Sequence, residues 1–236
     1  MPEPVVFLPG LMCDARLFGP QIADLSRDHA VMTAPITGGE RIEEIASTVL
    51  DMMPRRCALA GLSMGGIVAM EIYRRAPDRV TRLALMDTNP LAETPPVAAQ
   101  REPQILRARA GRLDDVMSEE LKPNYLAAGP HRGEILALVM DMARGLGVEV
   151  FVRQSRALQR RRDQQATLRR IDVPTLVLCG AEDTLCPIKR HVFMAEMIPR
   201  ADLRVIEGAG HLPTLERPEE TTRALRDWLS APLMLR

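Results

Sequence analysis

Short runs of apolar residues alternate along this chain with longer segments in which apolar residues recur every three or four positions. A short apolar run that ends at a turn signal is typical of a strand buried on both faces of a sheet. The first run, at 5–8, ends at Pro9-Gly10. Runs of this kind predict six strands, at 5–8, 30–36, 57–62, 82–86, 175–179 and 203–206.

Helical periodicity separates these predicted strands. In the segment 40–53, Ile42, Ile45, Val49 and Met52 share one face, and Pro54 ends the pattern. Strands that alternate with helices imply right-handed crossovers and a parallel α/β sheet covered on both faces. The predicted helices are 20–26, 40–53, 65–76, 189–198 and 218–229.

The alternation breaks once, between residues 87 and 173. This stretch opens with proline-rich turns and continues as an Arg-rich helical segment without a strand pattern or a separate core pattern. We therefore expect a helical cap at 94–170, inserted after the fourth strand of a core formed by 1–93 and 171–236. A cap over the carboxyl ends of parallel strands lies where open α/β sheets bind ligands.

Composition and charge argue against several classes of partner and location. Of 236 residues, 46% are hydrophobic and 26% charged, which is usual for a globular protein, and 31 basic residues balance 31 acidic ones. This balance gives no reason to expect a nucleic-acid partner or an acidic membrane surface. The four cysteines lack metal-ligand or disulfide-framework spacing, and neither a secretion signal nor a membrane-spanning stretch is present. We expect a cytoplasmic protein.

A serine flanked by glycines follows the third predicted strand directly, in Gly61-Leu62-Ser63-Met64-Gly65. Gly-x-Ser-x-Gly between a buried strand and an amphipathic helix is the arrangement of a nucleophile elbow, a sharp turn that exposes the serine hydroxyl. Such a turn leaves no room for side chains at the flanking positions, which explains glycine at 61 and 65. We predict that Ser63 is a catalytic nucleophile at a helix N-terminus, where N–H groups favour negative charge.

A serine hydroxyl needs a base to activate it. His211 follows the sixth predicted strand, at the end of the turn 208–211, and this places it at the same edge of the sheet as Ser63. His29, His131 and His191 have no such position and are expected at the surface. His211 is therefore the predicted base.

The acid that orients this base precedes it in the chain order Ser, Asp/Glu, His. Asp183 follows the fifth predicted strand at its carboxyl end and is the favoured acid. Two alternatives remain: Glu182, which would point the other way on an extended turn, and Asp87, at the end of the fourth strand.

A tetrahedral intermediate also needs donors for its oxyanion, namely the N–H after the nucleophile and an N–H from the loop after the first strand. These are the amides of Met64 and, in Leu8-Pro9-Gly10-Leu11, of Leu11. Serine, imidazole and backbone donors complete the chemistry, so no metal or organic cofactor is expected.

Three segments, 61–77, 175–183 and 208–218, resemble the α/β-hydrolase superfamily in sequence and order. Within it they look like the small-substrate branch of 3-oxoadipate enol-lactonases, carbon–carbon bond hydrolases, cofactor-free haloperoxidases and methyl-ester carboxylesterases. The resemblance covers the chain outside about 94–170. Pro9-Gly10 stands where the family usually has His-Gly, so we expect a loop of different shape that keeps the Leu11 amide. The N-terminal hairpin common in the family is missing, which predicts about six strands instead of eight.

The predicted cap is rich in apolar residues, which favours a mainly apolar pocket. Its run Arg160-Arg161-Arg162 has two interpretations, a solvated helix face or a site that steers a carboxylate-bearing substrate. The leading hypothesis is a serine hydrolase that cleaves a small, largely apolar ester or lactone through an acyl-enzyme. Hydrolysis of amide, thioester or carbon–carbon bonds by the same triad, or a weakly catalytic ligand-binding protein, remain alternatives. The sequence does not indicate an oligomeric state.

Overall fold

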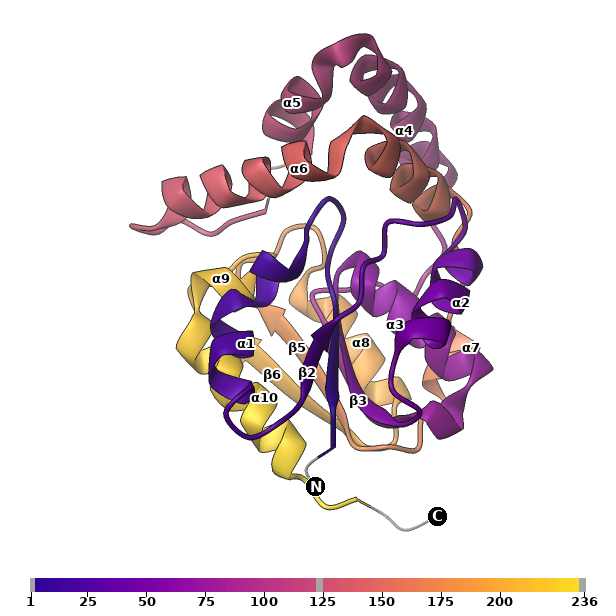
Figure 1. Ribbon diagram of the computed structural model, residues 1–236, viewed down its shortest axis with the longest axis vertical. Coiled ribbons are helices and arrows are strands. Elements are labelled where there is room, and N and C mark those ends of the chain that lie inside the picture. The colour runs from indigo at the N-terminus through magenta and orange to yellow at the C-terminus, as the bar shows by residue number, and fades with distance from the viewer. Residues whose placement is uncertain (1–2, 122–124, 234–236) are drawn as a thin grey trace.

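Parallel strands form the centre of the molecule. The computed structural model describes residues 3–121 and 125–233, and in these ranges it contains one sheet of six strands in the order β2-β1-β3-β4-β5-β6. Every neighbouring pair is parallel, as expected from the alternation of strands and helices. The strands are β1 Val5–Leu8, β2 Val31–Thr33, β3 Cys57–Leu62, β4 Val80–Met86, β5 Thr175–Gly180 and β6 Ala201–Ile206 (Figure 1).

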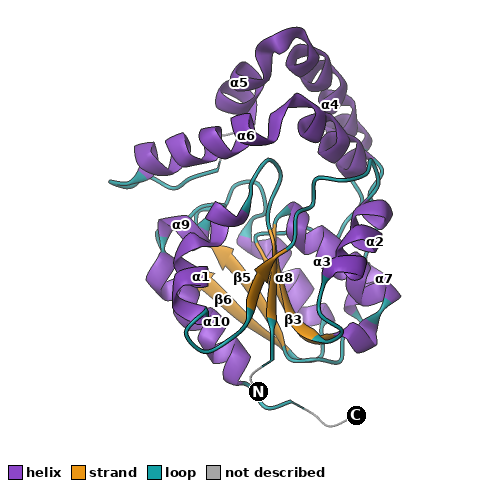
Figure 2. Ribbon diagram, viewed as in Figure 1, coloured by secondary structure: helices purple, strands orange, loops and turns teal. Residues whose placement is uncertain are grey.

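Helices cover both faces of this sheet (Figure 2). Successive residues of β1 point to opposite faces of the sheet, so both faces need a cover. Val6 and Leu8 belong to the apolar cluster that includes α2, α3 and α8. Val5 and Phe7 belong to the cluster that includes α1 and α10. The Phe7 ring also stacks on Phe18, with ring centroids 4.5 Å apart. The helices of the two layers are α1 Gly19–Leu25, α2 Ile42–Met52, α3 Met64–Arg75, α8 Ile188–Met197, α9 Pro213–Glu216 and α10 Pro218–Ser230, with short 3₁₀ turns at Ala15–Phe18 and Pro77–Arg79.

The edge strand β2 is shorter than the predicted segment 30–36. It ends at Thr33, because Pro35 has no N–H group to continue the ladder and the chain then leaves the sheet. Ile36 is nevertheless fully buried, and its carbonyl accepts a hydrogen bond from Gln154 Nε2 at 3.1 Å. The apolar pattern therefore predicted burial correctly beyond the end of the strand.

A helical insertion separates β4 from β5, as predicted. In Figure 1, α4, α5 and α6 lie together at one end of the molecule, beyond the sheet. Helix α6 bends at Gly147, which has a φ of 80°. Helix α7 contacts α3 and α8 on the sheet instead. The bounds are α4 Pro95–Arg107, α5 Leu113–Asp115, α6 Arg132–Gln159 and α7 Gln165–Leu168, with π-helical turns at Ala108–Arg112 and Val116–Leu121.

None of the helices in the described ranges is long and apolar enough to span a membrane. Helix α6 has the length, with 28 residues, but charged residues occur throughout it.

Candidate active site

Ser63 occupies a strained turn between β3 and α3. Its φ of 55° and ψ of −116° are unfavourable for a residue with a side chain. The turn is held by two hydrogen bonds, from the Ser63 amide to the Met86 carbonyl at 2.9 Å and from Thr88 Oγ1 to the Ser63 carbonyl at 2.7 Å. A Cβ atom on Gly61 would overlap the Gly65 carbonyl, and one on Gly65 would overlap the Leu8 carbonyl. The two glycines are therefore required by the close approach of β3, α3 and β1.

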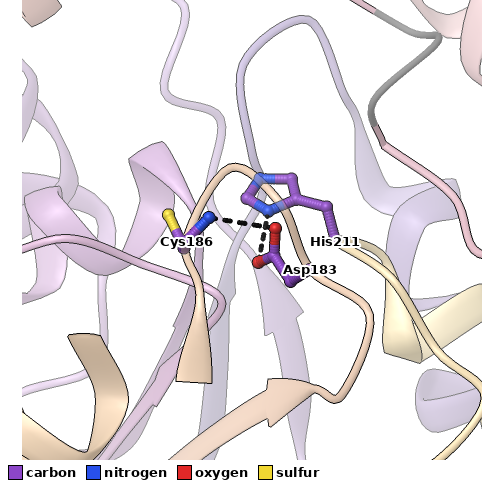
Figure 3. A group of neighbouring side chains, drawn as sticks. All are labelled: Asp183, Cys186 and His211. Carbon is purple, nitrogen blue, oxygen red and sulfur yellow. Dashed lines mark hydrogen bonds and ion pairs between the residues drawn. The ribbon is translucent and has the colours of Figure 1, made fainter. Parts of the chain in front are cut away.

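Asp183 and His211 lie side by side at the carboxyl ends of β5 and β6. His211 Nδ1 is 2.8 Å from Asp183 Oδ2, so the proton on this nitrogen points at the carboxylate (Figure 3). The amides of Leu185 and Cys186 donate to Asp183 Oδ1 at 2.8 and 3.0 Å. Burial would raise the pKa of Asp183, but the hydrogen bond and charge of His211, together with the Cys186 amide, hold that pKa below its usual range. The carboxylate is therefore ionised, and it fixes the ring with Nε2 directed away from it.

The two alternative acids have different surroundings. Glu182 is exposed, and its amide donates to the Ala209 carbonyl at 2.9 Å. Asp87 is fully buried, with a φ of 42°, and its Oδ1 accepts the Gly180 amide at 2.9 Å. Burial, followed by the charge of Asp183, raises the pKa of Asp87 well above its usual range. Asp87 is therefore a neutral acid that contacts Asp183.

The loop after β1 brings a second backbone donor to the site. Leu11 and Met64 both line the cavity described below, and among the described residues no protein acceptor takes up either amide. The loop is fixed from the helical insertion by Gln154 on α6, whose Oε1 accepts the Met12 amide at 2.9 Å. Met12 has a φ of 54°, so this bond stabilises an unfavourable backbone conformation. Two amides are thus free to bind a negatively charged oxygen.

One cavity of about 330 Å³ unites the predicted residues. Ser63, Met64, Leu11 and His211 all line it, and Asp183 lies behind His211. Apolar side chains from both the sheet region and the helical insertion complete much of its wall, including Ile67, Leu91, Val97, Leu158 and Leu185.

Two positions near the site were not found from the sequence. Glu216, on α9, accepts the amides of Gly210 and Ala127 at 3.0 and 2.7 Å through Oε1 and that of Leu212 at 3.0 Å through Oε2. It thereby holds the loop that carries His211. An acidic residue one turn after a glycine-rich loop is a capping signal that could have indicated it. The contact of Gln154 with Met12 had no such signal, because 142 residues separate the two.

The expectation that His191 lies at the surface is wrong. Its ring is fully buried, and its Nε2 accepts the Thr88 amide at 3.1 Å. Burial lowers the pKa of His191 to about 4, so the ring is neutral. The physical reason is its position three residues before buried Met194 on the inner face of α8. Through Thr88, His191 supports the Ser63 turn. The other two histidines expected at the surface are closer to that prediction, since His29 is half-buried and His131 is exposed.

A possible metal-binding group overlaps this site. Ligand atoms of Asp183, Cys186 and His211 lie within 4.8 Å of one another. A thiol ligand must be deprotonated, yet burial raises the pKa of Cys186 well above its usual range. The Nδ1 of His211 is also occupied by its bond to Asp183. These three residues fit a base–acid pair better than a metal centre.

The sequence and the structure were each compared with those of known proteins, and the comparisons agree on the family. The sequence matches the model of the Alpha/beta hydrolase family over residues 5–224. A pimeloyl-[acyl-carrier protein] methyl ester esterase from Aromatoleum aromaticum is 27% identical in an alignment of length 208 that covers 80% of this chain and 80% of that protein.

Two solved structures are similar over nearly the whole chain. A thermophilic esterase from Thermogutta terrifontis has a TM-score of 0.89 and 28% identity, over 96% of this chain and 89% of that one. The enol-lactonase from Burkholderia xenovorans LB400 has a TM-score of 0.83 and 26% identity, over 97% of this chain and 92% of that one.

Proposed function

Because the chain belongs to the alpha/beta hydrolase family, we propose that it is a serine hydrolase which cleaves a small carboxylic ester or lactone through an acyl-enzyme on Ser63. One observation carries this proposal. Ser63, His211 and the amides of Leu11 and Met64 line the same cavity, while His211 is oriented from behind by ionised Asp183.

The first half of the reaction forms the acyl-enzyme. The Nδ1–H of His211 donates a hydrogen bond to Asp183 and keeps its proton, so the lone pair of Nε2 is available to take the proton of Ser63 as Oγ attacks the ester carbonyl. The carbonyl oxygen becomes negative and is stabilised by the Leu11 and Met64 amides and by the N-terminus of α3. The intermediate then collapses, the C–O bond to the alcohol breaks, and His211 returns the proton to the leaving oxygen.

The second half regenerates the serine. A water molecule gives a proton to His211 and attacks the acyl carbon, and the ester bond to Ser63 breaks with return of that proton to Oγ. An ester yields an acid and an alcohol, whereas a lactone yields a single hydroxy acid. The negative charge of Asp183 stabilises the imidazolium that exists between these proton transfers.

The substrate class follows from the cavity and from similar proteins. A volume of about 330 Å³ suits a small molecule, and the wall near Ser63 is mostly apolar. Similar proteins include an esterase and an enol-lactonase, and this favours an oxygen ester as the substrate.

We assign the two parts of the chain accordingly. Residues 1–93 and 171–236 form the hydrolase core, which supplies the nucleophile, base, acid and oxyanion donors. Residues 94–170 form the cap, which supplies Val97 and Leu158 to the cavity wall. Gln154 couples the two parts through its bond to the Met12 amide.

Ester hydrolysis by purified protein tests the proposal. We expect p-nitrophenyl acetate and butyrate to give a burst of p-nitrophenolate, because acylation releases the phenol before the acyl-enzyme is hydrolysed. Ser63→Ala should lower kcat by about 10³-fold or more. Ser26→Ala, an exposed serine at the end of α1, is the matched control and should leave the rate unchanged. Equal turnover by wild type and Ser63→Ala would refute the mechanism.

A further inference from the structure

A carboxylate held by two arginines forms part of the cavity wall. Glu93 lies between β4 and α4, Arg101 on α4, and Arg161 two residues after the end of α6. Arg101 donates to Glu93 through Nε and Nη2 at 2.7 and 2.8 Å, and Arg161 donates through Nη1 at 2.9 Å. The exposed fractions of these side chains are 2% for Glu93, 13% for Arg101 and 10% for Arg161. The cluster is therefore largely dehydrated.

The charged side chains that line the cavity do not balance. They are three guanidinium groups, of Arg101, Arg161 and Arg190, and one carboxylate, of Glu93. Burial would raise the pKa of Glu93, but hydrogen bonds and charges from Arg101 and Arg161 lower it below its usual range. Glu93 is thus ionised, and three positive charges against one negative leave a formal excess of two positive charges in the wall.

Several guanidinium donors remain without an acceptor. In the part of the chain that the structure describes, Arg101 Nη1 and Arg161 Nη2 donate to no protein atom. Arg190, half-buried on α8, has no carboxylate within ion-pair distance in the same ranges. Guanidinium donors that face a cavity without a protein acceptor are available to a ligand anion, and a partly dehydrated site strengthens that contact. The wall is therefore suited to bind an anion.

Among three consecutive arginines, Arg161 alone points into the cavity wall. Its neighbours Arg160 and Arg162 have exposed fractions of 45% and 67% and pair with Glu40 and Glu43 outside the cavity. Of the run 160–162, only Arg161 lines the cavity, where its Nε is also fixed by the Leu91 carbonyl at 2.9 Å. Arg160 and Arg162 therefore fit the interpretation of a solvated face, whereas Arg161 has the position that the interpretation as a carboxylate site requires.

We propose that the cavity selects esters which carry a carboxylate at the end remote from the scissile bond, bound by Arg101, Arg161 and Arg190. This rests on the proposed function and narrows its substrate to half-esters of short dicarboxylic acids or lactones with a carboxylate. The planar guanidinium fork matches a carboxylate with two parallel hydrogen bonds. Apolar side chains of the same cavity wall, among them Ile67, Leu91 and Leu158, offer a surface for the connecting methylene groups.

Matched ester pairs test this selectivity. Monomethyl succinate and monomethyl glutarate are compared with methyl butyrate and methyl valerate, which lack the terminal carboxylate, by release of acid at constant pH. We expect kcat/KM of the wild type to be about tenfold or more higher for the half-esters, which corresponds to one charge-assisted contact. The preference should shrink as salt screens the charges. Equal kcat/KM for each pair would overturn the proposal.

Arginine variants locate the preference. Arg190→Gln and Arg161→Gln should each lower the ratio of half-ester to neutral-ester kcat/KM by about tenfold. Arg160→Gln is the matched control, because it removes the same charge one residue away but outside the cavity, and its ratio should equal that of wild type. Arg190 has no ion pair in the described ranges, so its variant remains informative even where Arg161→Gln fails to fold. A ratio lost equally in Arg160→Gln would contradict the site.

Binding of a dicarboxylate to protein without the nucleophile tests the anion site independently of catalysis. Glutarate is titrated by calorimetry into Ser63→Ala protein, which tests the anion site without turnover. Binding that weakens about tenfold in Ser63→Ala/Arg190→Gln supports the site even if neither ester is hydrolysed, in which case the catalytic proposal alone fails. Absence of glutarate binding to Ser63→Ala overturns the anion site, whatever the activity of the wild type.

Discussion

The buried carboxyl group of Asp87 contacts that of Asp183 where β4 and β5 end. Two carboxylates this close together repel each other, so one of them keeps its proton, and the surroundings decide which one. Asp183 accepts two amides in addition to His211, whereas Asp87 accepts one amide through Oδ1. Asp87 Oδ2 accepts no donor among the described residues. The proton therefore resides on Asp87, and the negative charge on Asp183 faces His211.

Replacement of each carboxyl by an amide should separate the two aspartates. Asp183→Asn removes the charge that stabilises the imidazolium and the acceptor that fixes the tautomer of His211, so kcat should fall by about four orders of magnitude. Asp87→Asn replaces a neutral donor by another of similar shape and should change kcat less than about threefold. Steady-state rates with p-nitrophenyl butyrate at pH 8 measure both. The opposite order would move the acid to the end of β4.

The pKa of Asp87 also predicts a pH dependence of stability. A carboxyl whose pKa is raised by folding binds its proton more tightly in the folded state, so the contribution of Asp87 to stability is complete below the ordinary pKa of about 4 and is lost as pH rises towards the raised value. The amide of Asp87→Asn cannot ionise. The free energy of unfolding of this variant, relative to that of wild type, should therefore increase as pH rises from 4. Urea titrations across this range measure the difference. Asp51→Asn, an exposed aspartate on α2, should show no such gain.

His191 predicts a loss of stability in acid. Burial lowers its pKa from 6.5 to about 4, so the unfolded chain binds a proton more readily between these values. The free energy of unfolding should fall by about 3 kcal/mol as pH drops through this window. His191→Gln should abolish most of that loss, since an amide can still accept the Thr88 N–H without titrating. His131→Gln, at an exposed position, should keep the dependence of wild type.

Glu216 predicts a positioning effect on His211. Glu216→Gln keeps one acceptor oxygen and sets an NH₂ group against the amide that the other oxygen bonded, at a cost of about 1–3 kcal/mol. We expect a lower melting temperature and a lower kcat with little change in KM, because the substrate contacts are retained. Glu219→Gln, exposed on α10, should behave as wild type. A change in KM alone would mean that Glu216 does not act through the His211 loop.

The sequence predicted best what depends on local pattern. Both faces of the sheet are buried, so each central strand is a short apolar run, and β1 and β3 have the predicted bounds. The turn at Ser63 was visible because Gly61 and Gly65 leave no space for a Cβ atom. Parallel topology brings the carboxyl ends of strands to one edge, so Asp183 and His211 could be expected near each other before their distance was known.

Contacts between distant segments were not predictable in the same way. The burial of His191 depends on the rotation of α8 against the sheet, and the bond of Gln154 to Met12 on how the helical insertion docks on the loop after β1. For the same reason, composition alone could not tell which arginine of 160–162 faces the cavity. Beyond the end of α6 the chain turns so that Arg161 pairs with Glu93 in the cavity wall, whereas Arg160 and Arg162 pair with Glu40 and Glu43 outside the cavity.

The most direct test of the account is to find the nucleophile by covalent trapping. A fluorophosphonate reacts with a serine only where a base and oxyanion donors activate it. The wild type treated with one equivalent should gain a single adduct, and tandem mass spectrometry of the peptides should place it on Ser63. Ser63→Ala and heat-unfolded wild type should gain none. No adduct on the folded wild type, or an adduct on another residue, would contradict the assignment of Ser63.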